Sequence, residues 1–310
     1  MRPASDARTI DLVTLGENSL DFVAVAGADR AVASKQRLRA FDMLPGGQTA
    51  TAAVAGARLG LRARYVGAFG DDEWGRRSRA ALGGAGVDVV AVEHHDVPSR
   101  IAVVIVNPDG DRHVLEHRDV RLRIDPIPDG AIETARVLVV DATDVTAAQV
   151  AARRARAAGV PVIVDVDRVD DQVDALLDLI DVIVAPVSFL DAATGASEPG
   201  TALERLAARY RSASAIIATL GDEGSLARTQ EGREIRTRAY RVDVVDTTGA
   251  GDAFRGGLAA AWVRLDAAAP LEDILRYANA TAALNCRAVG AQTALPTWAE
   301  VEGLVTKGGG

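Results

Sequence analysis

The sequence predicts an α/β protein in which a mostly parallel sheet is covered by helices on both faces. Short apolar stretches alternate with helical stretches from Val137 onward, which is typical of parallel strands joined by helical crossovers. Two stretches in the first 120 residues are strand-like without an intervening helix, and they predict a small separate antiparallel sheet. With 310 residues, of which 48% are hydrophobic, the chain can bury one substantial core.

The N-terminal part of the chain supplies both predicted sheets. Runs of β-branched and other apolar residues predict strands, and an alanine-rich run predicts a helix. The strands are Asp11 to Leu15, Leu20 to Ala26, Ala63 to Val66, Arg100 to Val106 and Arg112 to Glu116, and the helix is Thr49 to Leu59. The segment Asn107 to Asp111 carries Asn, Pro, Asp and Gly, which predict a hairpin turn between the last two strands.

The remaining elements are expected to alternate between strand and amphipathic helix. The strands are Val137 to Val140, Pro161 to Val166, Asp181 to Ala185, Ala215 to Thr219 and Tyr240 to Val245. The helices are Thr146 to Ala158, Val173 to Leu179, Thr201 to Tyr210, Ala253 to Leu265 and Leu271 to Arg287. No linker, internal repeat or low-complexity segment interrupts this order, so we expect residues 1–310 to form a single domain.

Composition and charge narrow the possible partners. A net charge of −8 argues against nucleic acid as a partner, and no apolar run of about 18 residues is available to span a membrane. The first residues, Met1 to Arg8, lack the apolar core of a signal peptide. The single cysteine, Cys286, rules out an internal disulfide. These features predict a cytoplasmic protein.

The most informative stretch is Asp-Thr-Thr-Gly-Ala-Gly-Asp-Ala-Phe, residues Asp246 to Phe254. Its glycines allow backbone N–H groups to turn toward an anion at a helix N-terminus. We expect the N–H groups of Gly249, Ala250 and Gly251 to form this anion cradle, and Asp252 to accept the proton of an attacking hydroxyl. An anion cradle beside a general base is the arrangement that phosphoryl transfer to an alcohol requires.

Other interpretations of this loop do not fit its spacing. A dinucleotide fingerprint needs a glycine three residues after Gly251, and Phe254 occupies that position. A P-loop needs Gly-Lys-Ser or Gly-Lys-Thr, which the chain does not contain. A simple glycine turn before a buried helix remains the structural alternative. Arg255, next in the chain, could reach a transferred phosphoryl group or only neutralise surface charge.

Five motifs in order resemble the PfkB family of carbohydrate kinases, the ribokinase-like enzymes. They are Asp246 to Phe254, Gly16 to Asp21, Pro45 to Ala53, Thr219 to Gly224, and the closing segments Gly290 to Gln292 and Leu295 to Thr297. The resemblance covers nearly the whole chain. It implies the ribokinase-like three-layer fold, with the small sheet acting as a lid whose strands lie within about residues 17–45 and 97–120. It also implies a homodimer formed through the lid.

The resemblance also implies where the ligands bind. Sugar contacts fall on Asp21, Gly46, Gly47 and Thr51, and ATP contacts fall on Thr219, Gly221, Gly224 and Asn279. Small residues around Asn279 fit close helix packing equally well. Mg²⁺ is expected with ATP, and a monovalent cation such as K⁺ is expected near Asp246 and Thr248. Asp246 could instead only brace the anion-binding loop.

The chain departs from the family pattern at two places. The family has asparagine where this chain has Thr51, which keeps a hydroxyl but loses the amide. The family often has Asn-x-x-Glu, linked to magnesium, where this chain has Val187 and Leu190. Neither apolar side chain can bind a cation, so we expect the metal to be held mainly through ATP phosphates and water.

The four histidines lie between residues 94 and 117 and include a His-x-x-Glu-His sequence at His113 to His117. This zinc-peptidase pattern works on a helix, where positions four apart share a face. The segment is expected to be a strand, which would separate the two histidines by roughly 13 Å, too far for one zinc ion. We therefore expect no zinc site here.

Together, these features predict an ATP-dependent kinase that phosphorylates a hydroxyl of a small sugar or sugar-like molecule. One alternative is a nucleoside kinase of the same fold, which would need an apolar base pocket under the lid. Another is a regulatory protein that binds sugar or nucleotide without catalysis, which the loss of Asn-x-x-Glu suggests. The intact Asp252 and its glycine loop argue against this second alternative.

Overall fold

The computed structural model describes residues 8–27, 37–107, 112–265 and 269–308. A nine-stranded sheet runs through this part of the chain in the order β13-β12-β11-β10-β9-β8-β1-β4-β5. The strands are β1 (Ile10–Leu15), β4 (Ala63–Gly70), β5 (Asp88–His94), β8 (Ala135–Asp141), β9 (Val162–Asp165), β10 (Val182–Pro186), β11 (Ala215–Thr219), β12 (Ser225–Thr229) and β13 (Glu234–Thr237). All pairs from β5 to β11 are parallel, whereas β12 and β13 extend the sheet as antiparallel strands.

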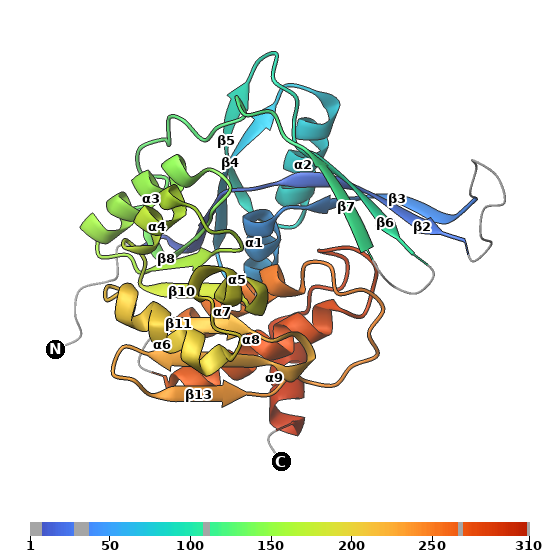
Figure 1. Cartoon of the computed structure of the whole chain (residues 1–310). Helices are drawn as coiled ribbons and strands as arrows, with labels where there is room; N and C mark the ends of the chain where they lie inside the picture. The colour runs from blue at the N-terminus through green and yellow to red at the C-terminus, as the bar shows by residue number, and fades with distance from the viewer. Residues whose placement is uncertain (1–7, 28–36, 108–111, 266–268, 309–310) are drawn as a thin grey trace.

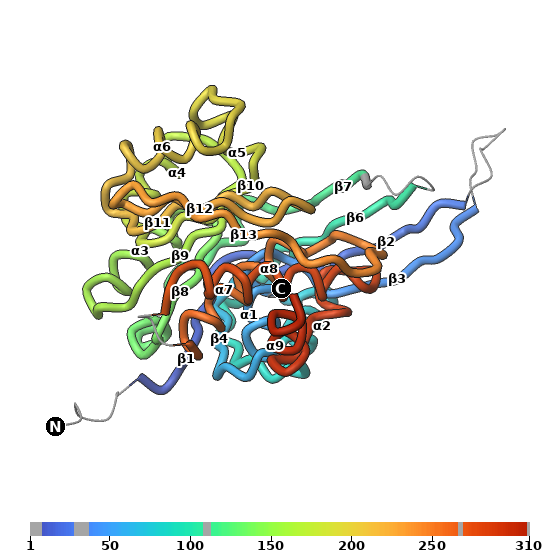
Figure 2. Tube along the Cα trace, turned by 90° about the horizontal axis from the view of Figure 1, so that it is seen from below, coloured from blue at the N-terminus to red at the C-terminus, as the bar shows by residue number. Residues whose placement is uncertain are grey.

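Helices cover both faces of this sheet, as Figures 1 and 2 show. One layer comprises α3 (Val145–Ala157), α4 (Asp171–Leu177), α5 (Val187–Thr194) and α6 (Pro199–Arg209). The other comprises α1 (Gln48–Arg58), α2 (Glu73–Gly84), α7 (Ala250–Arg264), α8 (Leu271–Asn285) and α9 (Trp298–Lys307). Alternate residues of each strand pack against opposite layers: Leu138 and Val140 belong to one core, and Val137 and Val139 to the other.

A second, four-stranded sheet projects from the side of the body (Figures 1 and 2). Its order is β3-β2-β6-β7, formed by β2 (Ser19–Ala26), β3 (Leu38–Gly46), β6 (Ile101–Val106) and β7 (Arg112–His117). This is the predicted lid sheet, and its strands fall where they were expected, with β3 ending one residue later. The pairs β2–β3 and β6–β7 are antiparallel, but the central pair β2–β6 is parallel.

Most predicted elements are confirmed within a few residues, but the strand predicted at Tyr240 to Val245 is wrong. Among the described residues, this segment pairs with no other strand. Its side chains alternate in burial up to Val242, but the exposed Val244 and Val245 lie beyond the edge strand β13, and Val245 donates its N–H to the Cys286 carbonyl. The predicted helix after the glycine loop begins earlier, at Ala250.

Two further predictions concern the lid and the membrane. The segment with His113 and His117 is a strand, as expected, and its register with β6 is regular. Most of the predicted hairpin turn, residues 108–111, lies outside the described residues. Within the part of the chain that is described, no helix is both long and apolar enough to cross a bilayer.

Candidate active site

The site lies at the carboxyl edge of the sheet, where the strand order reverses. From β1 the sheet continues through β4 on one side and through β8 on the other. Ligands of open α/β sheets bind in the crevice at such a reversal. The chain leaves this edge at Gly16 after β1, at Asp141 at the end of β8 and at Asp165 at the end of β9.

Asp252 lies in the first turn of α7, behind the glycine loop. Gly249 is the N-cap of this helix and has φ 72°, a left-handed conformation that favours glycine. A Cβ atom on Gly249 would also lie 2.7 Å from the Cα of Ala291. On the next turn, Gly256 packs directly on the backbone of α1, where a Cβ atom would lie 2.7 Å from the Ala52 carbonyl oxygen. These close contacts fix the start of α7, and Asp252 with it, against the sheet edge.

One N–H donor of the predicted anion cradle already makes a hydrogen bond within the glycine loop. The N–H groups of the first helical turn have no acceptor four residues earlier within the helix, so they are available to an anion. The Ala250 N–H donates to the Thr247 carbonyl at 3.2 Å. An anion that binds all three predicted donors would therefore replace this turn contact.

The surroundings of Asp252 make it a stronger base than an ordinary aspartate. Burial is the largest influence and raises the pKa of Asp252 to about 6. The positive charge of Arg255 lowers it, while three neighbouring carboxylates raise it further. These carboxylates belong to Asp141, Asp21 and Asp167. A carboxylate with a pKa near 6 is ionised at pH 7 and well matched to accept a proton.

Arg255 is a buried cation beside the base. Its side chain is only 6% exposed, and its terminal nitrogen Nη2 lies 2.5 Å from Oδ1 of the equally buried Asp165. The other terminal nitrogen packs on the glycine loop, because a Cβ atom on Gly251 would lie 2.6 Å from it. Burial raises the pKa of Asp165 well above its usual value, although Arg255 acts to lower it. Arg255 is thus part of the site and does not neutralise surface charge.

The predicted sugar-binding residues lie together where the lid joins the body. Asp21 on β2 accepts a hydrogen bond from the Ser19 hydroxyl at 2.6 Å. Gly46 at the end of β3 packs on this carboxylate, because a Cβ atom there would lie 2.2 Å from Oδ2 of Asp21. Gly47 is the N-cap of α1 and has φ 94°. Thr51 is fully buried in α1, and its hydroxyl accepts a hydrogen bond from the Gln292 amide at 3.1 Å.

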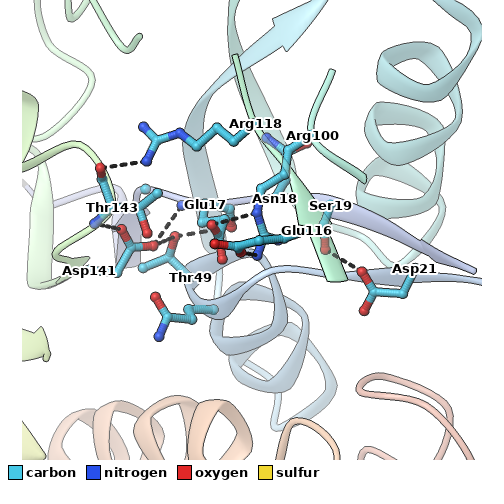
Figure 3. A network of polar contacts seen from close by, with 12 residues as sticks. Glu17, Asn18, Ser19, Asp21, Thr49, Arg100, Glu116, Arg118, Asp141 and Thr143 are labelled. Carbon is cyan, nitrogen blue, oxygen red and sulfur yellow. Dashed lines mark hydrogen bonds and ion pairs between the residues drawn. The ribbon is translucent and has the colours of Figure 1, made fainter. Parts of the chain in front are cut away.

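A polar network that the sequence analysis missed holds this region in place (Figure 3). Asp141 accepts the backbone N–H of Glu17 at 2.6 Å, the Thr49 hydroxyl at 3.0 Å and the N–H of Thr143 at 2.9 Å. Asp141 ends a correctly predicted strand. Because carboxyl ends of parallel strands meet at one edge of a sheet, an acid at each strand end was the signal that could have found Asp141 and Asp165.

Glu17, also missed, forms a buried charge cluster with lid residues. Its Oε1 lies 2.8 Å from Nε of Arg100 on the segment entering β6, and Arg100 also donates to Glu116 of β7 at 2.6 Å. Burial raises the pKa of Glu17 to about 8, although Arg100 acts to lower it. The cluster thus connects the first loop of the body to both strands of the second lid hairpin.

The predicted nucleotide-binding residues form a second group, at the end of β11. Thr219 ends that strand and pairs with Ser225 of β12. Gly221 and Gly224, with φ of 62° and 97°, form the turn between the two strands. Asn279 on α8 is buried, and its amide donates to Ser225 at 3.1 Å and to the Thr237 hydroxyl at 2.9 Å. The structure therefore brings these four residues to one corner of the sheet.

The predicted cation loop is braced by Asp246. Its Oδ1 accepts the N–H of Thr248 at 2.9 Å and the Thr248 hydroxyl at 2.7 Å, and its Oδ2 accepts the Gly290 N–H at 2.8 Å. At the position of the missing Asn-x-x-Glu element, Leu190 is buried in the core and Val187 is 45% exposed. The described residues contain no group of three or more His, Cys, Asp or Glu side chains able to hold a metal.

In a comparison with known proteins, one family matches almost the entire chain. A family model described as pfkB family carbohydrate kinase matches residues 9–298. An aminoimidazole riboside kinase from Salmonella typhimurium is 34% identical over 303 residues, which cover 91% of each chain. Fructokinase-1 from Oryza sativa is 31% identical over 94% of this chain and 96% of its own length.

A solved structure supports the same relationship. The ribokinase of Arabidopsis thaliana, determined in complex with ribose and ATP, is 25% identical and covers 96% of this chain and 98% of its own. Its TM-score against this structure is 0.83. The predicted fold class is therefore confirmed, including the parallel sheet between two helical layers and the lid.

Proposed function

We propose that this chain, which belongs to the pfkB family of carbohydrate kinases, transfers the γ-phosphoryl group of ATP to a hydroxyl of a small sugar or sugar-like molecule. The chain is an ATP-dependent carbohydrate kinase by its family and its relatives. The observation that supports the specific proposal is the placement of Asp252. A base with a pKa raised to about 6 lies in the first turn of a helix whose N-terminus can bind an anion.

In the proposed reaction, Asp252 takes the proton of the sugar hydroxyl as its oxygen attacks the γ-phosphorus. The bond from this phosphorus to the bridging oxygen of ATP breaks, and ADP leaves with the electron pair. The N–H groups of Gly249, Ala250 and Gly251 stabilise the charge on the transferred oxygens. Asp21 accepts sugar hydroxyls, and the glycine pair at 46 and 47 lets the backbone approach the sugar closely.

The nucleotide is proposed to lie on the other side of the glycine loop, against Thr219, Gly221, Gly224 and Asn279. Mg²⁺ would be held by the ATP phosphates and by water, and when bound it would neutralise phosphate charge. A monovalent cation at Asp246 and Thr248 would act through the loop, because Asp246 already positions Thr248 and Gly290.

We also propose that the lid mediates a homodimer. The face of the lid opposite Asp21 carries the apolar side chains of Phe22, Phe41, Met43 and Leu115 from three strands, and Phe22 also packs against Trp74 of α2. Phe41 and Leu115 are 55% and 52% exposed, which is unusual for large apolar side chains on a monomer. A second copy of the lid would bury this face while leaving Asp21 toward the sugar.

ATP consumption in the presence of Mg²⁺ and K⁺, measured over sugars, sugar acids and nucleosides, tests the proposed function. A sugar or sugar acid that stimulates the reaction and loses this effect in Asp252→Asn supports it. Stimulation by nucleosides alone would identify a nucleoside kinase. ATP binding without stimulation by any compound would favour a regulatory protein of the same fold.

A further inference from the structure

A cavity of about 250 Å³ opens beside the candidate active site, and three arginines line it. Arg118 and Arg123 come from the segment that follows the lid strand β7, and Arg168 follows β9. The cavity also contains the N-terminal residues of α3, including Thr146. We call it the arginine cavity. Its cations converge from two segments far apart in the sequence.

The positive charge of this cavity exceeds the negative charge that faces it. The one acid in its lining is Asp144, which is 7% exposed and already caps α3 through the Ala147 N–H. Arg123 lies 3.7 Å from Asp144, and Arg168 lies 3.5 Å from Asp170 at the surface.

Arg118 takes no part in these two ion pairs. It is partly buried and donates to the backbone carbonyl of Thr143 at 2.6 Å (Figure 3). Among the described residues, no carboxylate lies within ion-pair distance of Arg118; the nearby Glu17 pairs with Arg100, although the positive charge of Arg118 also lowers the pKa of Glu17. A guanidinium that is bound only to a carbonyl can still present donors to an anion in the fixed geometry that suits carboxylate and phosphate.

Hydrogen bonds link the walls of the arginine cavity to the proposed sugar site. Thr143 in its wall donates to Asp141, which in turn holds the N–H of Glu17 at the start of the loop leading to Asp21. On the other wall, Arg168 follows Asp167, which accepts the Gln48 amide at 3.1 Å next to the Gly46–Gly47 pair. Both walls are therefore attached to the two segments that bind the sugar.

Charge decides which end of a substrate can lie beside Asp252 and which end can lie in the arginine cavity. The carboxylates of Asp21, Asp141 and Asp167 surround Asp252 and raise its pKa, so the field at the reacting hydroxyl is negative. A second anionic group on the substrate would be repelled there. The arginine cavity is the adjoining place with surplus positive charge.

We propose that the substrate is a sugar derivative with a terminal anionic group, a carboxylate or a phosphate, which binds in the arginine cavity while the hydroxyl at its other end faces Asp252. This inference rests on the proposed function and adds the class of its substrate. Arg118 supplies the main contact, and Arg168 closes the cavity from the opposite side.

Matched pairs of compounds test the proposal: glucitol against gluconate, and fructose against fructose 6-phosphate. We expect a higher kcat/KM for the anionic member of at least one pair, and the pair that responds distinguishes carboxylate from phosphate. Arg118→Met should reduce that preference by about tenfold to a hundredfold, the value of a lost charge-assisted hydrogen bond. Arg153→Met, on the exposed face of α3 outside the cavity, is the matched control and should leave the preference unchanged.

The anionic substrate would be overturned if the neutral compound of both pairs had the higher kcat/KM and if the ratio of the two kcat/KM values were the same in wild type and Arg118→Met. The kinase proposal would remain intact. If no compound is phosphorylated, the proposed function fails, and calorimetric binding of gluconate and fructose 6-phosphate decides the inference separately. Binding that is lost in Arg118→Met would support the anionic site. Equal or absent binding of neutral and anionic members would overturn it.

Discussion

At the scale of single residues, the charges around Asp252 decide how readily its carboxylate accepts a proton. Burial and three neighbouring carboxylates favour its protonated form, and only Arg255 opposes them among the major influences. An isolated aspartate, with a pKa near 4, would be a weak base at neutral pH. In the proposed mechanism, the same negative charge would strengthen the base and repel anions other than the phosphoryl group, for which the N-terminus of α7 offers N–H donors.

The pH dependence of kcat/KM tests this environment. Asp252 must be ionised to accept a proton, so kcat/KM should fall about tenfold per pH unit below a pKa near 6. The profile should be measured at constant ionic strength, with His95→Gln as a control because the hydrogen bond with Asp71 raises the pKa of that exposed histidine above its ordinary value. An acid limb near pH 4 would show that Asp252 has an ordinary pKa and contradict the assignment.

The Arg255–Asp165 pair gives a second prediction. Arg255→Met leaves the buried Asp165 carboxylate without its cation and should lower the free energy of unfolding by about 3 kcal/mol. The loss should be larger at pH 8 than at pH 5, because at low pH the carboxyl group can bind a proton. Urea denaturation measures both values.

The double variant Asp165→Asn, Arg255→Met is the control for this pair. It removes both charges, so it should recover much of the stability that Arg255→Met loses. If the two single effects simply added, Arg255 and Asp165 would not be energetically coupled, and the ion pair would have no part in holding the start of α7.

At the scale of secondary structure, local sequence patterns were sufficient to predict a feature whose backbone conformation depends only on neighbouring residues. The glycine loop before α7 and the diglycine before α1 were predicted because their backbone conformations require glycine locally. The strand at Tyr240 to Val245 was predicted from alternation alone and is wrong, because a strand also needs a neighbour to pair with. The short strands β12 and β13 were missed for the opposite reason: they pair well but contain few apolar residues.

At this scale, the exposed apolar face of the lid sheet is predicted to form the dimer interface. Phe41→Asp places a charge in the middle of the exposed apolar face and should convert the proposed dimer to a monomer, because a buried unpaired carboxylate opposes association. Light scattering with size-exclusion chromatography measures the mass. Val150→Asp, which adds the same charge on the exposed surface of α3, is the matched control. A wild-type monomer, or a Phe41→Asp dimer, would contradict the lid interface.

At the scale of the whole molecule, the fold was predictable because alternating apolar strands and helices leave few arrangements other than a covered parallel sheet. The residues with proposed ligand roles, such as Asp252 and Gly46, were also predicted from the sequence. The network around them was not. Asp165 and Arg255 form an ion pair although 90 positions separate them in the sequence, and Glu17 and Arg100 do so at a separation of 83. Such contacts follow from the strand order, which no local pattern contains.

The most direct test of the central claim is the turnover of Asp252→Asn. The proposed base role predicts a fall in kcat by about 10² or more, with unchanged affinity for MgATP. Because the folded protein binds the Asp252 proton more tightly than the unfolded chain does, ionised Asp252 reduces stability above pH 6. The variant should therefore unfold at pH 8 no more easily than wild type, which separates lost chemistry from lost folding. Near-normal turnover in the folded variant would contradict the role of Asp252 as the general base.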